Sequence, residues 1–300
     1  MSTYHTSVLL QRSVEALNIN RDGVYVDATL GGAGHTREIL SHLSSKGRLI
    51  VFDRDSDALA NAPKDDRLIL VHNNFRFVHN FVRYSGFDKV DGILADLGVS
   101  SHQFDTSERG FSFRFDAPLD MRMNKLSSKT ARDIINNYDK EQLKNILKTY
   151  GEVEYSGKIA GLICSSREKK SIETTQDLRQ AIEKILPRNA EHKFLAKIYQ
   201  ALRIEVNGEM RSLENFLVGA LASLKQGGRL SLITYHSLED RMVKNFIRYG
   251  SIYGEQQSDI YGRLPSPLKA VNKKPELPTE SEIASNTRAR SAKLRIAEKI

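Results

Sequence analysis

A glycine-rich turn and a later carboxylate are the first residues in this chain whose types and spacing suggest chemistry. The turn is Asp27-Ala28-Thr29-Leu30-Gly31-Gly32-Ala33-Gly34-His35, and the carboxylate is that of Asp53. Glycines let a backbone turn sharply and approach a ligand without intervening Cβ atoms. A carboxylate at the end of the next strand can accept hydrogen bonds from both ribose hydroxyls of an adenosine. The pair predicts an adenosine-containing cofactor, and a purely structural turn is the alternative.

The spacing of the glycines favours one adenosine cofactor over another. A dinucleotide site has the pattern G-x-G-x-x-G, and counting from Gly32 and Gly34 places Arg37 where the third glycine should stand. A dehydrogenase is therefore disfavoured. S-adenosylmethionine has no pyrophosphate, so its loop can be looser, and a carboxylate such as Asp27 is useful near its ammonium or sulfonium group. We expect S-adenosylmethionine as the cofactor, with Asp27 and Gly31 among the residues that hold it.

Asp96, Tyr235 and His236 form a second group, because each lies at the end of a predicted strand. An acceptor such as Asp96 could localise the lone pair of a poorly nucleophilic substrate amine. His236 could take the proton released when that amine is methylated. The ring that stacks on the group carrying the amine could be that of Tyr235, Phe111 or Phe113. The alternatives are a turn acid at Asp96 and a helix capped by Ser237 with His236 merely packed.

The elements that must position these groups are read from the apolar runs. Four short buried-type runs separated by helical stretches indicate a parallel sheet covered on both faces: residues 24–27, 49–52, 68–71 and 90–94. Successive amphipathic helices then fill about 130–206, and a helix over 210–224 leads to a fifth strand over 229–234. Because the sheet resumes after the helices, an insertion explains the order better than two sequential domains.

We therefore predict an α/β fold, a Rossmann-like sheet with an inserted all-helical domain. Residues 1–108 and 207–300 would form the discontinuous cofactor-binding domain, and 109–206 the insertion that recognises the substrate. Prolines between Pro265 and Pro278 predict an extended loop, and the chain after Thr287 is a basic tail.

Composition restricts the classes of partner. The formal net charge of +8 favours a polyanion such as nucleic acid. The single cysteine, Cys164, excludes an internal disulfide and a cysteine-rich zinc cluster, which fits a reducing cytosol. The histidines lack metal-ligand spacing, so we expect no metal site. No uncharged run approaches the roughly 18 residues that span a bilayer, so we expect a cytoplasmic protein with no membrane partner.

Eight sequence blocks together resemble one known family, the bacterial small-subunit rRNA cytosine-N4 methyltransferases. They run in order along almost the whole chain. The blocks are His5 to Leu10, Asp27 to His35, Phe52 to Asp55, Asp96 to Ser101, Arg109 to Phe113, Pro118 to Met123, Tyr235 to Arg241 and Arg288 to Arg290. Two positions depart from the family loop: Ala33 replaces the first of two glycines before the histidine, and Thr36 replaces the serine after it. Since a backbone N–H donor needs only a small side chain behind it, we expect Ala33 to cost little.

The resemblance implies a class I methyltransferase fold and N4-methylation of a cytidine in the decoding centre of 16S rRNA. It implies 16S rRNA within the small ribosomal subunit as the partner, and it allows a homodimer. The residues implied to line the S-adenosylmethionine site are Ala33, Gly34, His35, Asp53, Phe75, Asp96 and Gln103.

Arginines interleaved with aromatic residues are the expected RNA contacts, because arginines neutralise phosphates and rings stack on bases. The candidates are Arg109, Phe111, Phe113, Arg241, Arg288 and Arg290. For the Arg109 to Phe115 stretch the alternative is a hydrophobic anchor of the insertion. Two other functions share the basic surface or the chemistry: a non-catalytic RNA chaperone, which would have no use for Asp53 and Asp96 at a crevice, and a DNA cytosine methyltransferase.

Overall fold

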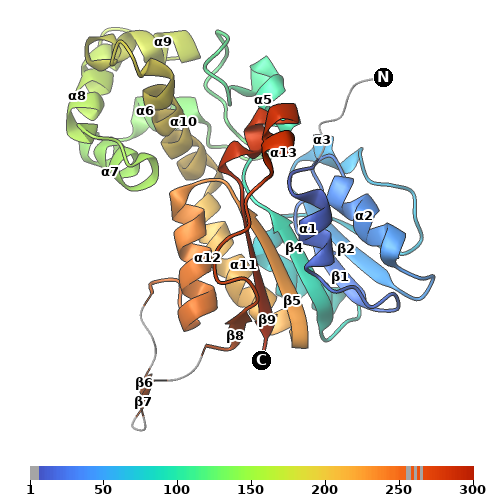
Figure 1. The fold of residues 1–300 in the computed structure, drawn as a ribbon. Helices are drawn as coiled ribbons and strands as arrows, with labels where there is room; N and C mark the ends of the chain where they lie inside the picture. The colour runs from blue at the N-terminus through green and yellow to red at the C-terminus, as the bar shows by residue number, and fades with distance from the viewer. Residues whose placement is uncertain (1–6, 255–257, 260–261, 264–265) are drawn as a thin grey trace. The chain divides into compact units, whose positions relative to one another are not determined.

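The computed structural model describes residues 7–254, 258–259, 262–263 and 266–300 (Figure 1). His5 and Thr6 of the first block lie outside the described residues. The chain forms two compact units, which we call the sheet unit (Met1–Gly98 with Met210–Ile300) and the helical unit (Val99–Glu209). The helical unit starts earlier than the expected 109 because Val99 and Phe104 pack against its own core.

The sheet unit is built on a seven-stranded sheet with strand order β3-β2-β1-β4-β5-β9-β8. The first five strands are parallel, as the apolar runs predicted. They are β1 (Val24–Asp27), β2 (Arg48–Asp53), β3 (Leu68–His72), β4 (Val90–Asp96) and β5 (Leu224–Thr234). Because they are parallel, Asp27, Asp53, Asp96 and Thr234 end their strands at one edge of the sheet, which we call the carboxyl edge.

Helices cover both faces of this sheet, and alternate strand residues point to each face. Tyr25, Leu49 and Val51 pack in a cluster with Val14 and Ile39, from the helices on one face. Val26, Ile50 and Phe52 pack on the other face. The helices of the unit are α1 (Leu10–Glu15), α2 (Gly34–His42), α3 (Ser56–Leu59), η1 (Phe75–Phe77), α4 (Val78–Tyr84), α11 (Glu209–Ser223), α12 (Ser237–Tyr249), α13 (Glu280–Ser285) and η4 (Thr287–Ser291). In Figure 1, α1 and α2 lie on one side of the sheet, and α11 and α12 lie on the other.

The C-terminal part of the sheet differs from the prediction of a loop and a free basic tail. β9 (Lys293–Lys299) runs antiparallel beside β5, and β8 (Leu268–Ala270) pairs with β9. The Arg295 guanidinium is buried and paired with Asp240 of α12, with an Nε–Oδ1 distance of 2.7 Å. Lys293 also lies near Asp240. The tail prediction was wrong because the charges of this segment hold a strand to a helix. A separate pair of short strands, β6 (Ser258–Asp259) and β7 (Gly262–Arg263), follows α12.

The helical unit packs around its own apolar core, which includes Ile134, Leu143, Ile159, Leu178 and Leu202. Its helices begin at polar caps; Thr130, Asp139 and Thr174 each form a capping box. The elements are α5 (Ser101–Asp105), η2 (Ser107–Arg109), α6 (Ala131–Asn137), α7 (Lys140–Gly151), α8 (Ser156–Arg167), α9 (Thr175–Ala181), η3 (Glu183–Ile185) and α10 (Glu191–Asn207). Among the described residues, no helix is both long and apolar enough to cross a membrane.

Candidate active site

The backbone of the glycine loop between β1 and α2 is held by hydrogen bonds to two side chains. Gly31 has φ +48°, and a Cβ placed on it would meet no atom within 4 Å. Its N–H donates to Asp53 Oδ2 at 3.0 Å, and its carbonyl accepts from Asn61 Nδ2 at 2.8 Å. Asp53 therefore faces the loop, and there is open space beside Gly31 for a ligand to approach.

Gly34 opens α2 in a place where no larger residue fits. A Cβ on Gly34 would overlap the hydroxyl of Ser7. The next residue, His35, is buried, and its Nε2 lies 3.2 Å from the carbonyl of Val8. Burial lowers the pKa of His35 to about 4, so the ring is neutral at neutral pH. Its ring holds the N-terminal segment against the loop, and any contact of His35 with a ligand would come from its backbone.

Ala33 has a conformation that the sequence did not indicate. Its φ is +63°, in the left-handed region that favours glycine, and it is fully buried. Its N–H donates to the carbonyl of Leu30 at 2.6 Å. In this structure the donor closes the turn, and a contact of Ala33 with the cofactor stays a prediction.

Asp27 is fully buried at the end of β1. Its Oδ1 accepts from the Thr29 N–H at 3.1 Å and its Oδ2 from the Thr36 hydroxyl at 2.6 Å. Burial raises the pKa of Asp27 to about 7, although these hydrogen bonds oppose the rise. Its carboxylate holds the glycine loop through these contacts, and a role of Asp27 near the cofactor cation stays a prediction.

Asp53 ends β2 and binds two backbone donors. Besides the Gly31 N–H, it accepts from the Asp55 N–H at 2.8 Å. Desolvation raises the pKa of Asp53, and both backbone hydrogen bonds oppose that rise. Two of the predicted cofactor residues, Gly31 and Asp53, are therefore joined by a direct hydrogen bond.

Asp96 ends β4 and is joined to Tyr235, which follows β5. The Tyr235 hydroxyl donates to Asp96 Oδ1 at 2.7 Å. Burial raises the pKa of Asp96 to about 7, while the Tyr235 hydrogen bond lowers it. The Tyr235 ring also lies against Gly98, whose φ is +100° and where a Cβ would be 3.4 Å from the ring. An aromatic ring and a carboxyl group therefore meet at the carboxyl edge.

His236 is the N-cap of α12, a position that the alternative interpretation had given to Ser237. Its Nδ1 accepts from the Glu239 N–H at 3.4 Å, and its Nε2 lies 3.1 Å from Glu239 Oε1 without a hydrogen bond. Glu239 Oε2 in turn accepts from the N–H of Tyr235 at 2.9 Å. The imidazole therefore belongs to a cap that fixes the backbone under Tyr235.

A family model described as the MraW methylase family matches residues 2–300. Ribosomal RNA small subunit methyltransferase H of Bacteroides thetaiotaomicron is 54% identical to this chain over 99% of it and 98% of that protein. The protein of the same name from Parabacteroides distasonis is 52% identical over 100% of this chain and 98% of its own.

The chain belongs to the MraW methylase family. Among solved structures, a putative rRNA-methylase from Clostridium thermocellum has a TM-score of 0.46 and 13% identity, covering 99% of this chain and 100% of that chain. Membership of the family confirms the predicted class I methyltransferase fold and S-adenosylmethionine as the cofactor. The carboxyl edge of this methylase fits that cofactor, because Asp53 and open space beside Gly31 occur together there.

Two further residues that the resemblance implied lie in different units. Phe75 is half-buried in η1, directly after β3, and packs edge-on against Phe216 with ring centroids 5.1 Å apart. Gln103 is in the helical unit, where it is buried and forms a capping box with Ser100. Phe75 therefore shares the carboxyl edge with Asp53, whereas Gln103 belongs to the other unit of the methylase.

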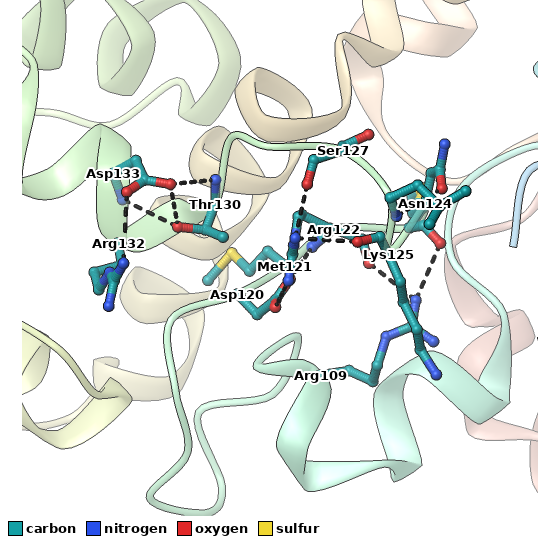
Figure 2. A network of polar contacts seen from close by, with 12 residues as sticks. Arg109, Asp120, Met121, Arg122, Asn124, Lys125, Ser127, Thr130, Arg132 and Asp133 are labelled. Carbon is teal, nitrogen blue, oxygen red and sulfur yellow. Dashed lines mark hydrogen bonds and ion pairs between the residues drawn. The ribbon is translucent and has the colours of Figure 1, made fainter.

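The predicted RNA contacts in the helical unit are mostly buried within it. The Arg109 side chain is 6% exposed, and its Nη2 donates to the carbonyls of Arg122 and Met123 (Figure 2). Phe111 is part of the core, and Phe113 packs on Tyr199 with centroids 5.2 Å apart. The prediction that Arg109 and Phe111 contact RNA is corrected: the apolar anchor, which was the alternative, describes this stretch.

The predicted RNA contacts in the sheet unit are more accessible. Arg241 and Arg290 are exposed, and Arg288 is half-buried. Ala289, between the two C-terminal arginines, packs in the same cluster as Tyr235. The η4 turn that carries these arginines therefore lies beside the Tyr235 end of the carboxyl edge.

Sequence reasoning missed Thr29 and Glu239 at this edge. The Thr29 hydroxyl accepts the N–H of Asp96 at 2.8 Å, and Glu239 supports Tyr235 as described. A signal for Glu239 was present, because a glutamate at the third helical position is typical of a capping box. Thr29 gave no such signal, since its partner lies 67 positions away in the chain.

Proposed function

We propose that this methylase transfers a methyl group from S-adenosylmethionine to the N4 amine of a cytidine in the decoding centre of 16S rRNA. Curated relatives more than 50% identical over nearly their full length are named ribosomal RNA small subunit methyltransferase H, which supports small-subunit rRNA as the substrate. A reaction on ribosomal RNA takes place in the cytoplasm. Decoding-centre cytidine N4 as the target rests on the family resemblance and on the chemistry of the carboxyl edge.

The cofactor would be held by the residues around the glycine loop. Asp53 would accept from the ribose hydroxyls, Gly31 would allow close approach, and Phe75 would lie along the same edge. When bound, S-adenosylmethionine supplies a methyl group made electrophilic by its sulfonium charge. The rest of the reaction depends on how the chain orients the amine and where it places the proton.

The observation that carries the proposal is the 2.7 Å hydrogen bond between Tyr235 Oη and Asp96 Oδ1. It leaves the second carboxylate oxygen, Oδ2, to accept a hydrogen bond from the target amine, which localises the nitrogen lone pair. Methylation makes that nitrogen cationic, and the nitrogen must then lose a proton. Because the pKa of Asp96 is raised to about 7, its carboxylate is suited to accept this proton near neutral pH.

Tyr235 is the aromatic residue that we assign to the target base, because Phe111 and Phe113 pack in the core of the helical unit. Its phenol orients Asp96 while its ring stacks on the base. His236 acts through Glu239, which fixes the Tyr235 backbone. Arg241, Arg288 and Arg290 would contact RNA phosphates.

The test is methyl transfer to small ribosomal subunits, with the modified nucleotide and atom mapped by mass spectrometry. Asp96→Asn keeps the shape but not the basicity, and we expect turnover at saturating cofactor to fall by about 100-fold or more. The wild-type rate should rise with pH through about 7. The control is Asp66→Asn, an exposed acid. Near-normal turnover by Asp96→Asn, or a methyl group on another atom, would contradict the proposal.

A further inference from the structure

Thr29 lies in the glycine loop between two carboxyl groups of the carboxyl edge. Its backbone N–H donates to Asp27 Oδ1 at 3.1 Å, and its hydroxyl oxygen accepts from the backbone N–H of Asp96 at 2.8 Å. The same hydroxyl also hydrogen-bonds with Asp27 and lowers the pKa of that carboxyl. One short side chain thus connects the end of β1 to the end of β4.

Asp27 fixes both ends of the loop that contains Thr29. It binds Thr29 at the start of the loop and the Thr36 hydroxyl in the first turn of α2. Because Asp27 is fully buried, these contacts do not compete with water. The position of the Thr29 hydroxyl is therefore determined by the same carboxylate that shapes the cofactor loop.

We propose that Thr29 is a positioning residue that couples the glycine loop to Asp96. It touches no reacting atom, and it acts by holding the backbone from which the Asp96 carboxylate projects. The inference rests on the proposed role of Asp96. Small displacements of a reacting group can cost up to about 100-fold in rate, so a fixed Asp96 backbone matters for the rate of transfer.

Thr29 and Thr36 form a matched pair for testing this role. Both hydroxyls bind Asp27, but of the two threonines only Thr29 hydrogen-bonds with Asp96 in the described part of the chain. If the hydroxyls only stabilised the loop, removing either one would change kcat to a similar extent. A positioning role would appear as a loss of kcat that is specific to Thr29.

The experiment compares Thr29→Val, Thr29→Ser and Thr36→Val in methyl transfer to small ribosomal subunits, with S-adenosylmethionine affinity measured by calorimetry. Valine keeps the shape of threonine and removes the hydroxyl. We expect Thr29→Val to lower kcat about tenfold while the cofactor Kd stays within about twofold, and Thr29→Ser to restore the rate. Thr36→Val should instead weaken cofactor binding. Equal effects of both valine variants on kcat would overturn the proposal.

A double variant separates this inference from the proposed function. If Thr29 acts through Asp96, Thr29→Val should have no further effect on kcat in an Asp96→Asn background. An additive loss would show that Thr29 acts elsewhere. If Asp96→Asn alone is fully active, the proposed function fails first and independently. Should Thr29→Val not bind the cofactor, Thr29→Ala is the second variant, and an unchanged kcat with normal cofactor affinity in either variant would refute the coupling.

Discussion

Asp27 in the sheet unit and Arg109 in the helical unit are both buried charged side chains beneath an irregular loop. Each loop also contains a buried non-glycine residue with positive φ, namely Ala33 (φ 63°) and Met121 (φ 59°). Asp27 accepts from the Thr29 N–H and from the hydroxyls of Thr29 and Thr36, whereas Arg109 donates to two carbonyls. The negative side chain of Asp27 thus binds a backbone donor of its loop, and the positive side chain of Arg109 binds backbone acceptors of its own.

The difference lies in what each charge can become. Burial raises the pKa of Asp27 to about 7, so its protonation changes near physiological pH. An arginine side chain keeps its charge under all such conditions. In the helical unit a second polar side chain, Asn207, binds the same loop. Its Nδ2 donates to Met121 O at 2.7 Å, and its Oδ1 accepts from the Met123 N–H at 2.8 Å. The loop of the helical unit is therefore held by side chains whose charge does not change with pH, while the cofactor loop depends on Asp27, which titrates near neutral pH.

Arg109→Met gives the largest expected effect, and it tests how much the hydrogen bonds of Arg109 stabilise the loop of the helical unit. Methionine retains much of the apolar bulk but leaves the carbonyls of Arg122 and Met123 without this donor. We expect the free energy of unfolding in urea to fall by about 3 kcal/mol. The control is Arg132→Met, whose ion pair with Glu173 is exposed and should contribute no more than about 0.5 kcal/mol. A loss below about 1 kcal/mol for Arg109→Met would mean that the packing of the loop, not its charge, holds it.

Asp53→Ala is expected to affect the cofactor more than the fold, in contrast to Arg109. The substitution removes the acceptor of the Gly31 N–H and the proposed acceptor of the ribose hydroxyls. Hydrogen bonds to a charged group correspond to a loss of about 10- to 100-fold in S-adenosylmethionine affinity. Calorimetry on the folded variant measures this loss. Unaltered affinity would remove Asp53 from the site, and Asp66→Ala, an exposed acid, serves as the control.

The positions of the first five strands along the chain, and of the acids Asp27, Asp53 and Asp96 at their ends, could be predicted from the sequence, because buried parallel strands are continuous apolar runs followed by polar residues. β9 was missed although Lys293 to Arg295 alternate charged with apolar residues as a strand does, because its charges suggested a solvated tail. Its Arg295 is buried only because Asp240, on a distant helix, pairs with it. Such a long-range pair leaves no local pattern in the sequence.

The acidic residues of the candidate site could be predicted from the sequence, but the residues that hold the surrounding loops in place could not. Asp53 and Asp96 follow their strands directly, so their type and position were both visible. The left-handed φ of Ala33 was not, because alanine seldom has that conformation and only the Leu30 carbonyl and the surrounding packing impose it. Arg109 was predicted to bind RNA because arginine beside aromatic residues is typical of RNA surfaces, but the same pattern also occurs where a buried arginine donates to backbone carbonyls.

The pH dependence of stability sharpens the comparison between the two charges. The folded-state pKa of Asp27, about 7, lies above its ordinary value of 3.8, so the native state binds the proton more tightly than the unfolded state. Asp27 should therefore make stability fall as pH rises from about 4 to 7, whereas His35, whose pKa burial lowers from 6.5 to about 4, should oppose part of this fall.

Asp27→Asn should flatten this fall, by at most about 1.4 kcal/mol per pH unit, and Asp96 and Asp53 should retain part of it because burial raises their pKa values too. Urea unfolding at several pH values measures the slope. Arg109→Met should lower stability equally at each pH. An unchanged slope in Asp27→Asn would show that Asp27 is ionised throughout this range in the folded protein.

Ala33→Gly is expected to give the smallest effect, because three contributions nearly cancel. Relief of the left-handed conformation should stabilise the fold by about 1–2 kcal/mol. The greater backbone freedom of glycine costs about 0.5–1 kcal/mol, and the loss of one buried methyl group costs about 0.8 kcal/mol. The net change in unfolding free energy should lie within about 0.5 kcal/mol of zero. Met121→Gly has the same φ relief but loses a fully buried side chain, so it should destabilise by about 2–5 kcal/mol. A clear gain for Ala33→Gly would mean that strain at Ala33 outweighs its packing, and the family's usual glycine would then be explained by conformation alone.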